Sequence, residues 1–152
     1  MNSGDPYYSS MVRSSIRSIL IRQEAMENNW NEIILTDPQG NLSEILDGNL
    51  FIRFGNDILV PSAATNTLPR VMSGIVRDIC RQAGFTLSES DELCSTHLID
   101  ADEIFISDDL NGIRWVLSFE KKRYYRKAAV TISDELNRLV RRTDQFHMGS
   151  SG

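Results

Sequence analysis

The carboxylate of Glu44 is the side chain in this sequence whose setting most favours chemistry. It follows the turn Pro38-Gln39-Gly40-Asn41, where proline fixes one φ angle and glycine supplies a positive one. Asn49 opens the next expected strand. A carboxylate held in this way can accept hydrogen bonds or pair with a cation. The alternative is an edge-strand glutamate in solvent, which composition alone favours.

The basic run Lys121-Lys122-Arg123-Tyr124-Tyr125-Arg126-Lys127 is a second candidate, and it contains every lysine of the chain. Cations interleaved with aromatic rings can contact nucleic acid. The net charge of −5 and the pI near 5.0 argue against nucleic acid as a partner. The run is therefore expected to be a solvated loop, or to face the acidic region 89–109 within the domain or across a dimer.

Other common reactive motifs are missing from the sequence. It has no glycine-rich phosphate loop, no G-x-S-x-G, no H-E-x-x-H and no paired C-x-x-C, so no metal site is predicted. His97 follows a short acidic segment and is expected at a surface or helix end. Cys80 and Cys94 are expected to be reduced thiols of a cytoplasmic protein. No apolar run reaches membrane-spanning length, so no membrane partner is expected.

The elements that must position these residues follow from apolar spacing and turn signals. With 152 residues, 41% of them hydrophobic, the chain is expected to form one domain over residues 8–142. Residues 1–7 are expected to be a flexible lead-in, and 143–152 a disordered tail that resembles a cloning remnant. Helices are predicted over 11–29, 71–83, 91–97 and from Ser133, and strands over 32–37, 42–46, 49–54, 58–61, 85–89, 103–107 and 113–119. This irregular order favours a mixed α+β domain.

Several short motifs, taken in order, resemble the class IV aminotransferases, also called fold-type IV pyridoxal-phosphate enzymes. The resemblance covers roughly residues 8–140 and only the larger, C-terminal domain of that family. It implies a barrel-like mixed sheet with flanking helices, usually in a dimer. The matching segments are Gln23-Glu24-Ala25, Asn31 to Asp37, Gly40, Ser43-Glu44, Asn49-Leu50-Phe51, Leu68-Pro69 and Ala101 to Phe105.

The resemblance implies pyridoxal phosphate as the cofactor, and this chemistry needs a lysine amine to form a Schiff base and move a proton. Counting back from the Gln23 motif places that lysine at Met11. Neighbouring positions offer no lysine either, and no lysine occurs in the first 120 residues. Arginine cannot substitute, because its guanidinium stays protonated. No catalytic residue is therefore predicted.

The remaining cofactor positions are partly retained. Glu44 and Asn49 match cofactor-binding positions, and the glutamate of the family pairs with the pyridine nitrogen. The phosphate positions fall at Val71 and Met72, at the start of a helix, and at Asp109, where a carboxylate replaces the family's small hydroxyl residues. Because a carboxylate repels phosphate, cofactor binding is expected to be weakened or lost.

Three hypotheses follow for function. The first is a degenerate, inactive aminotransferase-like domain used in assembly or ligand binding, as a homodimer or with another aminotransferase-like chain. The second is an active enzyme that recruits Lys121, Lys122, Lys127 or a lysine of a partner. The third is an interaction module that uses the basic run.

Overall fold

The structure is a computed structural model that describes residues 19–30, 32–45, 48–62 and 71–148. The chain divides into two units, Met1–Ile34 and Leu35–Gly152. In the first unit, residues 19–28 are helical, within the predicted helix 11–29. Its apolar side chains Ile19, Leu20 and Met26 are largely exposed. Residues 11–18, with Met11, lie outside the described residues.

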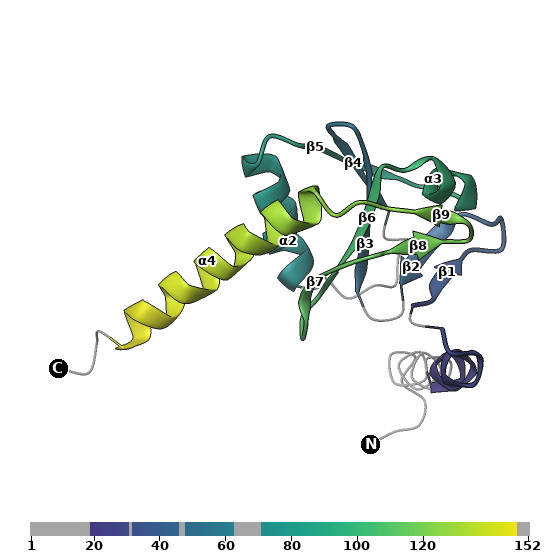
Figure 1. Ribbon diagram of the computed structural model, residues 1–152, viewed down its shortest axis with the longest axis horizontal. Helices are drawn as coiled ribbons and strands as arrows, with labels where there is room; N and C mark the ends of the chain where they lie inside the picture. The colour runs from purple at the N-terminus through teal and green to yellow at the C-terminus, as the bar shows by residue number, and fades with distance from the viewer. Residues whose placement is uncertain (1–18, 31, 46–47, 63–70, 149–152) are drawn as a thin grey trace, which may run out of the picture. The chain divides into compact units, whose positions relative to one another are not determined.

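The second unit is built on a five-stranded mixed sheet of order β5-β4-β3-β6-β7 (Figure 1). Only the β4–β5 pair is parallel, and the other neighbours are antiparallel. Strands β1 and β2 form a second, two-stranded sheet, and β8 and β9 a third. The strands are β1 (Ile34–Thr36), β2 (Leu42–Ile45), β3 (Asn49–Phe54), β4 (Asp57–Pro61), β5 (Thr86–Ser90), β6 (Glu103–Asp108), β7 (Gly112–Trp115), β8 (Ser118–Phe119) and β9 (Lys122–Arg123).

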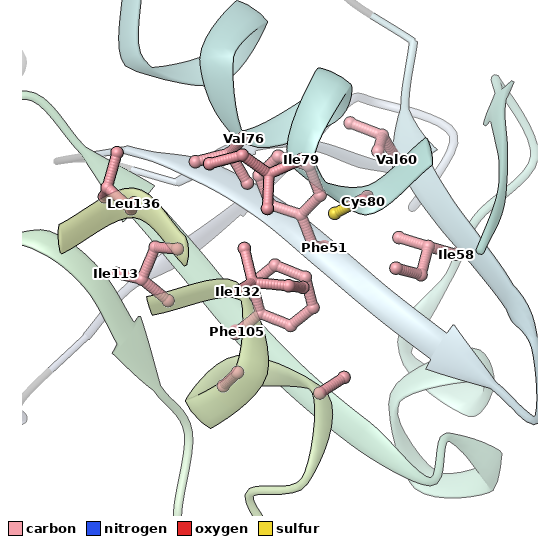
Figure 2. Close-up of a cluster of buried hydrophobic side chains, with 12 residues drawn as sticks. Phe51, Ile58, Val60, Val76, Ile79, Cys80, Phe105, Ile113, Ile132 and Leu136 are labelled. Atoms are coloured by element: carbon pink, nitrogen blue, oxygen red, sulfur yellow. The ribbon is translucent and has the colours of Figure 1, made fainter. Parts of the chain in front are cut away.

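The main hydrophobic core lies between one face of this sheet and two helices, α2 (Val71–Gln82) and α4 (Ala128–Met148). Phe51 of β3 and Phe105 of β6 are paired across the strands, and their rings stack with centroids 4.9 Å apart (Figure 2). Val76 and Ile79 of α2 cover these rings at the three-residue spacing of one helix face. The α+β class, with a mixed sheet and flanking helices, is confirmed.

Strand β6 is buried at all six positions, because its other face is covered as well. On that side β2 and α3 (Ser95–Asp100) contact the neighbouring strand β3. Leu42 of β2 donates its N–H to the carbonyl of Leu93, and both side chains are buried. Burial of a polar side chain without a hydrogen-bond partner is costly, and β6 has three buried polar residues: Glu103, Ser107 and Asp108.

Local turn chemistry agrees with the predictions. Asp37 accepts hydrogen bonds from the backbone N–H groups of Gln39 and Asn41, and Gly40 takes the positive φ of 89° that the turn requires. The hydrogen bonds from Asn41 are the main cause that lowers the pKa of Asp37. Gly84, with φ of 89°, ends α2 as predicted.

Most strands agree with the predicted bounds within one or two residues, and three elements differ more. Helix α3 spans Ser95–Asp100 rather than the predicted 91–97, because the extended backbone of Cys94 excludes this residue from the helix. The predicted strand 113–119 is two strands, β7 and β8, which belong to different sheets. Helix α4 begins at Ala128 rather than Ser133, because Glu103 binds its first N–H groups. It continues to Met148, so residues 143–148 are helical where the sequence predicts a disordered tail.

Candidate cofactor site

The N-terminus of α2 meets the turn that follows β6. The backbone N–H of Met72 donates to Oδ1 of Asp109 at 3.1 Å, although the two residues are 37 positions apart. Helix α2 has no acidic residue in its own first turn. The free N–H groups and dipole at a helix N-terminus attract an anion. Asp109 supplies that anion from the neighbouring turn.

Asp108, the neighbour of Asp109, holds this turn in place. Its carboxylate accepts the N–H of Leu110 at 2.7 Å and of Asn111 at 3.2 Å, and the side-chain amide of Asn111 at 2.7 Å. Nη2 of Arg114 lies 3.3 Å from Oδ2 of Asp108, which is almost fully buried. The bend closes at Gly112, which pairs with Asp108 and has φ of 74°. The backbone that carries Asp109 is therefore fixed by contacts on both sides.

The same end of the sheet carries two buried polar atoms that have no hydrogen-bond partner. Asn49 opens β3 and is paired with Ser107 near the end of β6. Nδ2 of Asn49 and Oγ of Ser107 are both buried and unpaired. Alternation along the strands puts them on the Phe51 and Phe105 face, toward the helices. Ser107 was not among the predicted site residues, although a hydroxyl directly after the apolar run Ile104–Ile106 was a usable signal.

The structure brings most of the predicted cofactor positions together. Met72 and Asp109 are hydrogen-bonded, and Val71, with 77% of its surface exposed, directly precedes Met72. Asn49 is at the same end of the sheet, because β3 is antiparallel to β6. Glu44 belongs to β2, which contacts β3 and β4, but its side chain lies outside the described part of the structure.

The lysines lie toward the opposite end of β6. Lys127 directly precedes α4, whose first N–H groups donate to Glu103 at the start of β6, both at 2.8 Å. The hydroxyl of Tyr124 donates to the carbonyl of Leu98 in α3, two residues before α3 ends. Figure 1 shows the separation: the bend between β6 and β7 is at the lower end of the sheet, and α4 starts near the upper end.

The basic run was predicted to be a loop. The structure corrects this, because Lys122 and Arg123 form strand β9. Part of the run is used within the chain. The guanidinium of Arg126 lies 4.6 Å from the centre of the Trp115 ring, and Nζ of Lys122 lies 5.6 Å from the Tyr124 ring. These cation–π contacts engage two cations of the basic run within the chain itself.

Cys94, Thr96 and His97 form a separate cluster at the start of α3. Sγ of Cys94 lies 3.0 Å from Oγ1 of Thr96 and 3.3 Å from Nδ1 of His97. Nδ1 also accepts the N–H of Cys94 at 3.1 Å, so His97 has the helix-end role that the sequence predicts. The hydrogen bond with Thr96, followed by that with His97, lowers the pKa of the Cys94 thiol to about 7.

We expect Cys94 to react with iodoacetamide at rates that rise with pH and have their midpoint near pH 7. The lowered pKa leaves about half of the thiol as the reactive thiolate at that pH. Cys80 is the internal control, because burial raises its pKa to about 12. Mass spectrometry of peptides labelled across a pH series measures both sites. A Cys94 midpoint near the ordinary thiol value of about 8.5, or equal labelling of Cys80, would contradict this expectation.

Metal-ligand clusters and membrane-spanning helices are two further features that the described ranges could contain. No group of three His, Cys, Asp or Glu side chains there is arranged to hold a metal ion. None of the helices in these ranges is both long and apolar enough to cross a membrane.

The fold and this site define an α+β domain in which a helix N-terminus and a strand-end turn meet beside a mixed sheet. A family profile described as amino-transferase class IV matches residues 11–119. The chain belongs to the class IV aminotransferase family.

Related proteins match most of this chain in sequence or in fold. A methionine aminotransferase of Arabidopsis thaliana is 25% identical over 118 residues, which are 74% of this chain and 33% of that protein. The 4-amino-4-deoxychorismate lyase of Pseudomonas aeruginosa has a TM-score of 0.72 at 19% identity, over 80% of this chain and 45% of the lyase. An aminotransferase of Brucella abortus, bound to pyridoxal phosphate, has a TM-score of 0.65 at 22% identity, over 75% of this chain and 42% of that one. The chain thus spans less than half the length of these relatives.

The described residues do not fit the pyridoxal phosphate that the family implies. The phosphate is an anion, and the N–H of Met72 at the helix N-terminus already binds the carboxylate of Asp109. Two like unit charges about 4 Å apart repel by roughly 1 kcal/mol in water and roughly 4 kcal/mol at the effective dielectric near a protein surface. The cofactor aldehyde needs an amine, and the lysines lie toward the other end of β6.

Proposed function

We propose that this chain is a class IV aminotransferase-like domain that does not carry out transamination and that serves in assembly or ligand binding. The position of the lysines is the observation that carries this proposal. Transamination needs a lysine amine beside the cofactor. Lys127 precedes the α4 N-terminus bound by Glu103, whereas Asp109 and Met72 meet beyond the other end of β6. The six residues of β6 span about 17 Å at about 3.4 Å per residue.

The alternative is an active enzyme that uses a lysine from elsewhere. Lys121, Lys122 and Lys127 would need to cross the length of β6, and a lysine side chain is too short to do so from the position of Lys127. A lysine supplied by a second copy of this chain would avoid this geometry, but it would still be Lys121, Lys122 or Lys127, so the experiment below tests it as well.

We expect pyridoxal phosphate followed by borohydride reduction to leave no stoichiometric pyridoxyl adduct on any single lysine. Without an amine in the site, only sparse labelling shared among the exposed lysines is expected. Intact mass and peptide mapping measure the adduct, and an amino-donor assay measures turnover. The Lys127→Ala variant is the control, and it should leave both readouts unchanged. One adduct per chain at a specific lysine, together with turnover, would overturn the proposal.

The assembly role that we favour is a homodimer formed through the outer half of α4. The apolar stripe of this helix begins with Ile132 and Leu136, which are buried against the sheet. It continues through Leu139 and Val140, which are 37% and 50% exposed. A stripe that continues beyond its own core is suited to packing against the same stripe of a second copy.

The Val140→Glu variant is expected to shift a dimer toward monomer, because it places a charge in the apolar stripe of α4. Sedimentation equilibrium over a range of protein concentrations measures the dissociation constant, which we expect to rise at least tenfold. Asn137→Glu adds the same charge elsewhere on the exposed part of α4 and should leave the constant unchanged. A monomeric parent chain, or equal effects of the two variants, would contradict the dimer proposal.

A further inference from the structure

The anion position at the N-terminus of α2 is filled by the chain itself. This helix has twelve residues and so a developed N-terminal positive end, yet none of its own first-turn residues is acidic. The charge that meets it comes from Asp109, whose Oδ1 accepts the Met72 N–H. A carboxylate and a phosphate compete for the same backbone donors.

The position of Asp109 is set by a rigid turn. The carboxylate of Asp108, 5% exposed, gathers donors from Leu110, Asn111 and Arg114. The ladder between β6 and β7 continues up to the Asp108–Gly112 pair, so the turn begins and ends on paired strands. The turn therefore holds the backbone of Asp109 beside the N-terminus of α2.

We propose that Asp109 acts as an internal substitute for a bound phosphate and keeps phosphate-bearing ligands away from the α2 N-terminus. Its carboxylate satisfies the Met72 N–H and repels a second anion. The inference concerns anion binding alone and goes beyond the proposed loss of transamination, which depends on the lysines.

Inorganic phosphate tests this directly, with the Met72 amide as the reporter. The backbone amide resonances of the parent chain and of Asp109→Ser are followed by NMR during a titration with phosphate at constant ionic strength. We expect no saturable shift of the Met72 amide in the parent chain. In Asp109→Ser we expect a saturable shift, with phosphate bound at least about tenfold more tightly.

Two further variants make the result decisive. Asp109→Asn removes the charge while keeping the size of the side chain. It should gain phosphate binding even if serine at this position disturbs the turn. Asp134→Asn removes the same charge from an exposed position on α4 and should behave as the parent chain does. Saturable phosphate binding by the parent chain would overturn the proposal, as would equal titrations of the parent chain and both Asp109 variants. Neither outcome bears on lysine labelling, so failure here is distinct from failure of the proposed function.

Discussion

The Glu103→Ala variant is expected to lose about 3–5 kcal/mol of the free energy of unfolding. Glu103 is 1% exposed, and its two carboxylate oxygens accept the N–H groups of Ala128 and Ala129, each at 2.8 Å. Nη1 of Arg53 lies 3.7 Å from Oε2 of the same carboxylate. Removal leaves two buried N–H groups without acceptors and a largely buried cation without its partner.

Urea unfolding followed by circular dichroism measures this loss. Glu103→Gln keeps the volume and one acceptor oxygen, so it should cost less, about 1–3 kcal/mol. Glu135→Ala is the matched control, because its carboxylate pairs with Arg138 on the surface of α4 and such pairs contribute at most about 1 kcal/mol. Equal losses in Glu103→Ala and Glu135→Ala would show that Glu103 does not hold α4 to the sheet.

The location of the effect gives a second measurement. Because Glu103 binds the first amides of α4, Glu103→Ala should speed hydrogen exchange there before it affects α2. A uniform increase over both helices would instead indicate a general loss of stability.

The second large effect is expected from Gly48→Ala, which should lose about 3 kcal/mol. A Cβ atom built at Gly48 would lie 2.5 Å from the backbone oxygen of Ser107 and 2.6 Å from Cγ2 of Ile106. The oxygen belongs to β6, an inner strand of the sheet, and cannot move without shifting the ladder with β3. Even the smallest side chain therefore displaces the strand that carries the candidate site.

Gly74→Ala is the control for Gly48→Ala. Gly74 lies inside α2, and no atom is within 4 Å of its added Cβ. Alanine there should raise stability by about 0.5–1 kcal/mol, because it restricts the unfolded chain and favours helix. The two substitutions are chemically identical, so opposite signs isolate the steric contact at Gly48. Two effects of the same sign and size in urea unfolding would contradict the crowding argument.

The sequence alone was sufficient for elements defined by local patterns. The bounds of β3 and the start of α2 agree with the predictions, because apolar periodicity acts within a few residues, and Gly84 stops α2 within one residue of its predicted end. The turn at Gly40 follows for the same reason, since Asp37 and Asn41 bond within the turn itself. Membership of the class IV family was also predicted from the sequence, because several motifs that are weak alone are specific when they occur in the right order.

The tertiary structure decided what depends on distant partners. Helix α4 begins at Ala128 because of a carboxylate 25 residues away, and no local signal contains that contact. The sequence predicted that Asp109 would repel a phosphate, but only the fold shows that its carboxylate meets the N–H of Met72. Strand pairing likewise put Asn49 opposite Ser107, a neighbour that local patterns did not reveal. Local rules determine the elements, whereas a charge or a buried donor finds its partner only after the sheet has brought remote segments together.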